Sequence, residues 1–335
     1  MNNNKNKILM IIKENLYDLI FSHIEEKFKK EFDLIKIYQE DFKSKKTIKK
    51  LSDLKEVKGY VGSWGSPELD QELLKLLPKL EIVALAKGSV KGYICKEAFK
   101  KGIVATSAHM ALAPSVAETT LMLTLMGLKL YKKQRKRMEQ GKRRTSNPVG
   151  YELISKTVGL IGYGRIARRF RKLLQSFDTD ILVYDPYLNQ ENIAEEDIKL
   201  VSLDELVIKS DIISLHAPGT EDNDSLIDAD VLSRMKDDAL LVNTARGMLI
   251  DERALYEELK TGRIRAALDV FRTEPLPSDS PLRELDNVVL TPHIGGFTYD
   301  SRKHAGELVF NELKRYFNNQ ELKYKAVPED LNHRA

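Results

Sequence analysis

The chain has 335 residues, enough for two domains of ordinary size. Hydrophobic residues make up 42% and charged residues 31%, which excludes intrinsic disorder for the bulk of the chain. With 54 Lys and Arg against 50 Asp and Glu, the net charge of +4 gives no global argument for binding nucleic acid or an anionic membrane. The single cysteine, Cys95, excludes a disulfide framework and a thiolate metal site. We expect a cytoplasmic globular protein.

The first third of the chain alternates short apolar runs with helical stretches. Apolar residues recur at helical spacing in residues 16–32 and 71–80. Strands are predicted at residues 8–12, 34–38, 59–63, 81–86 and 102–107. Strands separated by helices predict a parallel sheet with helices on both of its faces. The apolar run near the amino terminus is interpreted as the first strand of this sheet rather than as a signal peptide.

The segment 115–144 links this series to a second one. Its first half is predicted to be a long apolar helix between two domains, and its longest uncharged apolar stretch, residues 119–128, is far short of the ~20 residues of a membrane span. Its end, from Lys132 to Arg144, has eight basic residues and one acid, Glu139. We interpret this run as a solvated helix end and loop. The alternative, binding of a polyanion, lacks the interleaved aromatic residues that stack on bases.

A second series of buried strands follows. It is predicted within residues 156–164, 180–185, 199–203, 210–218, 238–247, 264–271 and 287–293. Each run is short and rich in Val, Ile and Leu, and the later ones end in residues with reactive or polar side chains. Since ligands of open parallel sheets bind at the carboxyl ends of the strands, these residues are candidates for a site.

The segment from Gly162 to Ala167 (GYGRIA) fits the pattern G-x-G-x-x-G/A between a strand and a helix. Gly162 permits the tight turn, and Gly164 allows the backbone to approach a pyrophosphate at the helix amino terminus. Asp185 ends the next strand, 23 residues after Gly162, where an acid binds the ribose hydroxyls and repels a 2′-phosphate. The sequence therefore predicts NAD rather than NADP. The alternative is a structural turn with an unrelated strand-end acid.

Three later strand ends supply Arg246, Glu274 and His293, and around them the sequence resembles the D-isomer-specific 2-hydroxyacid dehydrogenases. Between residues 156 and 296 the resemblance is carried by TVGLIGYGRIA, VYDPY, SLHAPGTEDN, LLVNTARGMLIDERAL, AALDVFRTEPLP and NVVLTPHIGG. The segment SVAETTLML, residues 115–123, is similar to the family's interdomain helix. The residues before about 110 match mainly in pattern.

The resemblance implies a role for each of the three residues. Arg246 would bind the substrate carboxylate, because a guanidinium grips it through two parallel hydrogen bonds. His293 would be the general acid/base, since imidazole exchanges a proton near neutral pH, and Glu274 would orient it. Further cofactor contacts are assigned to Tyr163, Arg165, Ile166, Ala217, Pro218, Thr244 and Ala245, with Asp269 on the nicotinamide carboxamide. His216 is interpreted as a packing residue, and no metal is expected.

The chain departs from the family in its first third. Where family members commonly carry Gly-x-Asp-x-Ile-Asp after the strand 81–86, this chain has AKGSVKGYIC. Its Lys87, Gly88 and Ser89 still resemble a turn whose amides hold a carboxylate. Trp64 follows another predicted strand, and its alternative interpretation is a core or interdomain residue. These four residues, together with Arg246, are our candidates for substrate binding.

The resemblance implies an α/β fold of two Rossmann-like or flavodoxin-like parallel-sheet domains separated by a cleft. The substrate-binding domain would comprise residues 1–114 and 303–335, and the NAD-binding domain residues 115–302. The implied function is interconversion of a 2-keto acid and a D-2-hydroxy acid by a homodimer, without nucleic-acid or membrane partners. Two rivals are a formate dehydrogenase-like enzyme, which would have Gln at the position of Glu274, and a NAD-sensing regulator like the family's transcriptional corepressors. The intact Arg246, Glu274 and His293 argue against a pure sensor.

Overall fold

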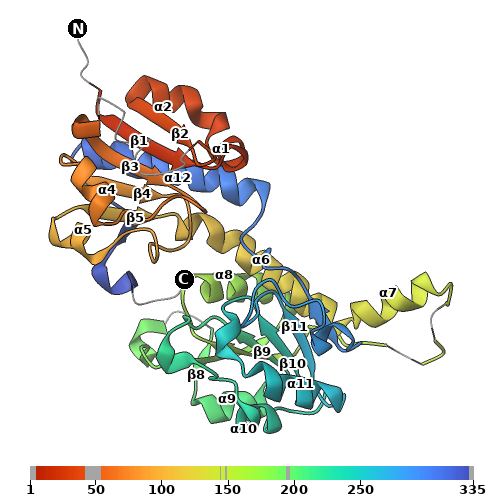
Figure 1. Ribbon diagram of the computed structural model, residues 1–335. Helices are drawn as coiled ribbons and strands as arrows, with labels where there is room; N and C mark the ends of the chain where they lie inside the picture. Colours follow the sequence, from red (N-terminus) through yellow and green to blue (C-terminus); the bar gives the residue numbers. More distant parts are fainter. Residues whose placement is uncertain (1–4, 42–53, 144, 148, 194–196, 332–335) are drawn as a thin grey trace. The chain divides into compact units, whose positions relative to one another are not determined.

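The computed structural model describes residues 5–41, 54–143, 145–147, 149–193 and 197–331 (Figure 1). Its contacts divide the chain into two compact units. Unit 1 contains residues 1–112 and 297–335, and unit 2 contains residues 113–296. The chain returns to unit 1 after Gly296, whereas the sequence placed this boundary after Arg302. The physical reason is that the residues after Gly296 begin a helix whose buried face packs in the core of unit 1.

The sheet of unit 1 contains the predicted parallel strands and one further edge strand. Its order is β13-β5-β4-β3-β1-β2, and the neighbouring pairs are parallel except β13 with β5. The edge strand comes from the end of the chain and was not predicted. The strands are β1 (Lys7–Ile12), β2 (Asp33–Tyr38), β3 (Val57–Gly62), β4 (Ile82–Leu85), β5 (Val104–Ser107) and β13 (Lys325–Ala326).

Helices cover both faces of this sheet, and each face has its own hydrophobic core. One core contains side chains of α1 (Glu14–Ile20), α2 (Glu25–Glu31) and α12 (Tyr299–Phe317), and the other contains those of α4 (Gln71–Leu76) and α5 (Lys96–Lys100). The predicted helix 16–32 is divided between α1 and α2. The helix within residues 71–80, which was predicted to close near Pro78, ends at Leu76, because the residue before a proline disfavours the helical conformation.

The sheet of unit 2 has seven strands in the order β12-β11-β10-β9-β6-β7-β8, all paired in parallel. Chain order reverses at β6, whose neighbours are β7 and β9, and such a switch point is where open α/β sheets bind ligands. The strands are β6 (Thr157–Ile161), β7 (Asp180–Tyr184), β8 (Lys199–Leu200), β9 (Ile212–Leu215), β10 (Leu240–Asn243), β11 (Arg265–Leu268) and β12 (Val288–Leu290).

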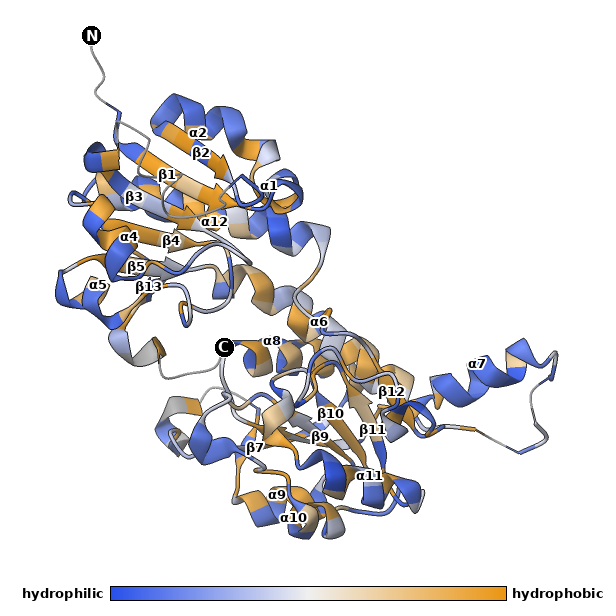
Figure 2. Cartoon of the chain, in the orientation of Figure 1, coloured by the Kyte–Doolittle hydropathy of each residue, from blue (hydrophilic) through white to orange (hydrophobic). Residues whose placement is uncertain are grey.

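Unit 2 is also packed on both faces of its sheet. Figure 2 shows the apolar strands lying between helices whose outer faces are hydrophilic. One core contains residues of α6 (His109–Leu128) and α8 (Arg165–Leu174), and the other contains residues of α9 (Leu203–Lys209), α10 (Ala229–Ser233) and α11 (Glu252–Lys260). By length and composition α6 could cross a membrane, but half of its apolar window is buried in the structure, as for a core helix.

The basic run after α6 forms α7 (Tyr131–Glu139), which projects from the body of unit 2 (Figure 1). Every residue of α7 is at least partly exposed. Several of its cations are bound by the chain itself: Lys132 Nζ donates to the carbonyls of Arg283 and Leu285, both at 2.6 Å, and Lys136 pairs with Asp286 at 3.2 Å. Arg144, the last residue of the predicted run, lies outside the described residues.

Candidate functional site

The glycine turn after β6 has the geometry that the sequence pattern demands. Gly162 has φ +83°, and a Cβ there would lie 2.7 Å from the backbone nitrogen of Ala217. Only glycine fits at this position. Gly164 is the N-cap of α8, and a Cβ built on it meets no described atom within 4 Å. The open space in front of Gly164 is therefore where a ligand can approach the backbone.

The amino terminus of α8 fits the diphosphate of a dinucleotide. Its N-cap has no side chain to accept hydrogen bonds from the first turn, where Arg165 and Ile166 lie. The free amides and the positive end of the helix macrodipole favour an anionic group there. The glycine turn and the helix start, residues 162–166, are thus the part of unit 2 that can hold the cofactor diphosphate.

Asp185 lies beside this turn at the end of β7. Its carboxylate accepts hydrogen bonds from the backbone nitrogens of Tyr163, at 2.8 Å, and Tyr187, at 3.0 Å. These two contacts fix the carboxylate next to the glycine turn. Each carboxylate oxygen can accept a second hydrogen bond, so Asp185 retains capacity for ribose hydroxyls.

His216 follows β9 on the other side of the glycine turn. Its Nε2 lies 3.0 Å from the hydroxyl oxygen of Ser214, and its ring packs against Phe170. Burial lowers the pKa of His216 from 6.5 to about 3, so the imidazole is neutral at physiological pH. The next residue, Ala217, is buried against Gly162, and Pro218 after it is exposed.

Arg246 follows β10 on a loop that a buried asparagine holds in place. Asn243 donates from Nδ2 to the carbonyl of Arg246, at 2.8 Å, and accepts at Oδ1 from the nitrogen of Ala245, at 3.0 Å. The hydroxyl of Thr244 lies 2.8 Å from that of Thr120 on α6. Sequence reasoning missed Asn243, although its position directly before the Arg246 motif at a strand end was a usable signal.

The guanidinium of Arg246 belongs electrostatically to the same cluster as Glu274. Its Nη1 donates to the carbonyl of Ala245. Burial lowers the pKa of Arg246, whereas the carboxylate of Glu274 raises it. A cation that is desolvated and lies near one carboxylate can bind a second, incoming carboxylate strongly.

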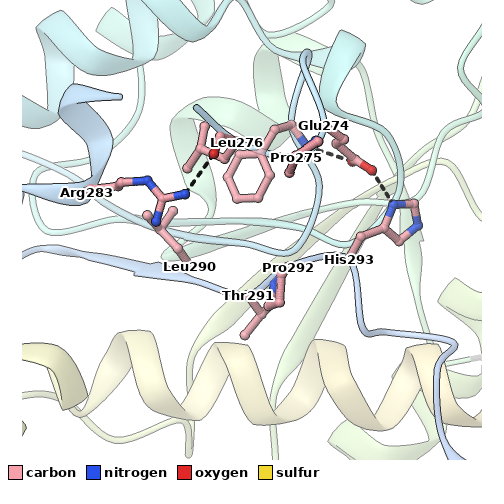
Figure 3. Close-up of a pocket in the computed structure, with 9 residues that line it drawn as sticks. Glu274, Pro275, Leu276, Arg283, Leu290, Thr291, Pro292 and His293 are labelled. Atoms are coloured by element: carbon pink, nitrogen blue, oxygen red, sulfur yellow. Dashed lines mark hydrogen bonds and ion pairs between the residues drawn. The ribbon is translucent and has the colours of Figure 1, made fainter. Parts of the chain in front are cut away.

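Glu274 and His293 form a direct pair in unit 2. Nδ1 of His293 lies 2.6 Å from Oε2 of Glu274 (Figure 3). The other carboxylate oxygen, Oε1, accepts from the nitrogen of Phe271 at 3.1 Å. With Nδ1 bound to the carboxylate, the ring presents Nε2 for proton exchange. The side chain of His293 remains half-exposed, so a substrate can reach it.

Asp269 builds the turn that carries His293. Its buried carboxylate accepts from the hydroxyl of Thr291, at 2.5 Å, and from the nitrogens of Ile294, at 2.9 Å, and Gly295, at 2.8 Å. Its carbonyl accepts from the nitrogen of His293 at 2.8 Å. The sequence assigned Asp269 to the cofactor and did not predict this second role. A strand-end acid followed by a turn rich in backbone donors was the available signal.

A cavity of about 500 Å³ lies beside the Glu274–His293 pair. Figure 3 shows the two residues at one end of it and Arg283, which donates to the carbonyl of Leu276, at the other. The remaining lining is apolar except for Thr291: Phe271, Pro275, Leu276, Leu290, Thr291 and Pro292. This cavity was not predictable from the sequence, because its walls come from three separate segments, residues 271–276, Arg283 and residues 290–293.

Four of the five candidate substrate residues lie in unit 1, and the fifth, Arg246, lies in unit 2. Nζ of Lys87 lies 3.4 Å from the ring centroid of Tyr93, and the hydroxyl of Ser89 accepts from the nitrogen of Lys91 at 3.1 Å. Trp64 packs against the hydrophobic core beside α12. Gly88 lies between Lys87 and Ser89 in the loop after β4. Among the described residues, no group of three or more His, Cys, Asp or Glu side chains could hold a metal ion.

Comparisons with known proteins point to one family. Residues 121–295 match the model of the family described as D-isomer specific 2-hydroxyacid dehydrogenase, NAD binding domain. A glyoxylate reductase from Korarchaeum cryptofilum is 35% identical over 87% of this chain and 87% of its own. A D-3-phosphoglycerate dehydrogenase from Methanocaldococcus jannaschii is 38% identical over 74% of this chain but 48% of its own. The chain thus spans about half the length of the phosphoglycerate dehydrogenases that it matches.

Solved structures match nearly the whole chain. A glyoxylate reductase from Paecilomyes thermophila has a TM-score of 0.80 and 26% identity, covering 97% of this chain and 99% of that one. An NADPH-dependent glyoxylate/hydroxypyruvate reductase from Sinorhizobium meliloti, in complex with NADP and malonate, has a TM-score of 0.75 and 27% identity, covering 99% of both. Together with the family match, these relatives identify the cofactor as a nicotinamide dinucleotide.

Proposed function

Because the chain belongs to the D-isomer-specific 2-hydroxyacid dehydrogenase family, we propose that it is a NAD-dependent D-2-hydroxyacid dehydrogenase. It would interconvert a 2-keto acid and a D-2-hydroxy acid. The observation that carries the proposal is the 2.6 Å contact between Glu274 and His293, with the Arg246 guanidinium held near the same carboxylate. The three residues belong to the unit that contains the glycine turn.

Each side chain has a separate task in this reaction. Arg246 binds the carboxylate of the keto acid and draws electron density from its carbonyl. When bound, the reduced dinucleotide supplies a hydride to C2, and negative charge then develops on the keto oxygen. Nε2 of His293 donates a proton to that oxygen, and in the reverse direction it accepts one. Glu274 holds the ring through Nδ1 and stabilises the imidazolium before the proton is transferred.

The cofactor assignments of the sequence analysis remain part of the proposal. The turn Gly162–Ile166 would hold the diphosphate, and Asp185 the adenosine ribose. Asp185 carries a negative charge where a 2′-phosphate would bind, so we expect NAD to be preferred over NADP. The remaining contacts would come from Ala217, Pro218, Thr244, Ala245 and Asp269. Oδ2 of Asp269 accepts from the nitrogen of Gly295 and has capacity for one further hydrogen bond, from the carboxamide.

Small 2-keto acids are the proposed substrates, with glyoxylate and hydroxypyruvate first. The support is the glyoxylate reductase relative, which this chain matches over 87% of its length. In unit 1, the amides of Gly88 and Ser89 are proposed to contact the substrate, together with Lys87 and Trp64. A cytoplasmic homodimer is the assembly expected from the family.

The experiment is a screen of NADH oxidation against a panel of 2-keto acids of different size and charge. The proposal expects turnover with at least one acid and a D-configured product. Binding of NADH without turnover of any acid would instead support the NAD-sensing regulator. Arg246→Lys provides the control, because an ammonium cannot reproduce the two parallel hydrogen bonds, and it should impair every substrate alike.

A further inference from the structure

One arginine of unit 1 is enclosed by two aromatic rings. The guanidinium of Arg302 lies 3.8 Å from the ring centroid of Trp64 and 4.5 Å from that of Phe297. Trp64 follows β3, Phe297 precedes α12, and Arg302 lies in the first turn of α12. Cation–π contacts occupy the two faces of a planar guanidinium. The N–H groups point outwards from its edge, where they can still donate hydrogen bonds.

In the described part of the chain, two of the three nitrogens of this guanidinium have no acceptor. Arg302 is 4% exposed, and its buried Nε and Nη1 have no hydrogen-bond partner. Within the described residues, no ion pair reaches its side chain. Nε and Nη1 of Arg265, which is buried to a similar degree, also have no partner, but its Nη2 donates to the carbonyl of Asp238. Buried arginines are normally paired with an acceptor, so the unfilled donors of Arg302 need an explanation.

The surroundings of Arg302 are suited to an anion that the chain itself does not supply. Burial lowers the pKa of Arg302 to about 10, yet the group stays cationic at neutral pH. Its stacking on Trp64 and Phe297 fixes the direction of the N–H groups before a ligand arrives, which reduces the entropy cost of binding. Carboxylate and phosphate oxygens are the acceptors that match a planar guanidinium.

We propose that Arg302 binds the anionic group, carboxylate or phosphate, of a small acid, and thereby helps to determine which acids the protein takes. The role of Arg302 in selecting substrates rests on the proposed dehydrogenase function, whereas the binding of an anion by Arg302 does not. Lys87, the other cation among the substrate candidates of unit 1, is a weaker candidate for the same task, because an ammonium lacks the planar fork of a guanidinium.

The chain provides its own probe for this site. Trp64 is the single tryptophan of the sequence, so intrinsic tryptophan fluorescence reports on the ring that stacks with Arg302. Malonate and, separately, inorganic phosphate are titrated into the full-length protein without dinucleotide. We expect saturable changes in Trp64 emission with at least one of them. Saturation with malonate alone indicates a carboxylate ligand, and saturation with phosphate alone indicates a phosphorylated acid.

Three variants separate binding from structure. Arg302→Met, which keeps the apolar stem, should weaken binding of the anion at least tenfold, and Arg302→Lys should retain part of it. Calorimetric titration gives the same comparison without relying on Trp64. The matched control is Lys36→Met, which removes another cation of unit 1 that lies 3.8 Å from a ring, that of Tyr17, but is already paired with Glu25. This control should bind the anion as the unmodified protein does.

Two results would overturn the proposal: no saturable response of the unmodified protein to either anion, or equal affinity in Arg302→Met. A lower melting temperature of Arg302→Met with unchanged anion affinity would mean that Arg302 only joins α12 to the Trp64 loop. With an active keto acid, Arg302→Met should raise KM at least tenfold and change kcat much less. If no acid is turned over, the proposed function fails, while the titrations still decide whether Arg302 binds anions.

Discussion

His293 has a backbone conformation that few histidines adopt. Its φ of +55° lies in the left-handed region, and the turn around it is held by hydrogen bonds to Asp269. This turn places the ring against Glu274. If His293 is the general acid, His293→Ala should lower kcat by roughly 10²–10⁴-fold in NADH oxidation assays with the best keto acid. The exposed His304 on α12 supplies the control, and its alanine variant should keep normal turnover; full activity of His293→Ala would remove this residue from the mechanism.

The desolvated imidazole of His216 predicts how the stability of the fold depends on pH. Its pKa is about 3 in the folded protein and 6.5 when exposed, so between these values the unfolded chain binds a proton that the folded chain does not. The contribution of His216 to the free energy of unfolding is therefore fully present above about pH 6.5, and it is lost as the pH decreases towards 3. Each pH unit within this window should cost about tenfold in the unfolding equilibrium. In urea unfolding at several pH values, His216→Phe should have a shallower acid dependence; an identical dependence would contradict the prediction.

At the scale of the element, the two glycines of the β6–α8 turn have different tasks. A Cβ at Gly162 would strike the backbone of Ala217, and its φ is positive, so Gly162→Ala should destabilise the protein by about 2 kcal/mol or more in urea unfolding. A Cβ at Gly164 meets no described atom. Gly164→Ala should thus unfold like the unmodified protein yet bind NADH at least about tenfold more weakly. Equal NADH affinity in this variant would exclude the turn as the diphosphate site.

The end of β7 predicts the choice of cofactor. Asp185 is fixed beside the glycine turn by the nitrogens of Tyr163 and Tyr187, so its charge cannot easily move away from a 2′-phosphate. Asp185→Ser should reduce the preference for NADH over NADPH by about tenfold, as kcat/KM ratios would measure. Asp185→Glu, which keeps the charge, should retain the preference. Equal kcat/KM for the two cofactors in the unmodified protein would refute the assignment.

The elements that the sequence predicted share one physical property. Parallel strands are buried on both faces, so runs such as residues 8–12 are apolar throughout and stand out without an alignment. The glycine turn was predictable because its chemistry is local. The hydrogen bonds of Asn243 to Ala245 and Arg246 are also local, and the position of Asn243 at a strand end was a usable signal for them. The stack of Arg302 on Trp64 was not predictable, because these two residues meet only through tertiary packing. For the same reason the contacts divide the chain after residue 296, whereas the expected division was after residue 302: Arg302 stacks on Trp64, which lies in the first third of the chain.

For the whole molecule, the two units differ in how the chain builds them. Unit 2 is one continuous segment, residues 113–296, with cores on both faces of its sheet. Unit 1 needs both ends of the chain, because Ala305, Val309 and Leu313 of α12 complete the core that contains α1. Gly306 lies so close to the backbone of Ile20 that a Cβ there would come within 2.0 Å of its carbonyl oxygen.

This difference predicts the behaviour of the separated parts. A fragment of residues 113–296 should unfold cooperatively and bind NADH, since it contains the whole glycine turn. A fragment of residues 1–112 should not fold, because the loss of α12 exposes apolar surface worth about 1.5–3 kcal/mol for each large side chain, and several such chains exceed the margin of a small domain. Addition of residues 297–335 as a separate peptide should restore part of its helical circular dichroism. Cooperative unfolding of residues 1–112 alone would contradict this prediction, because it would show that the core that contains α1 folds without α12.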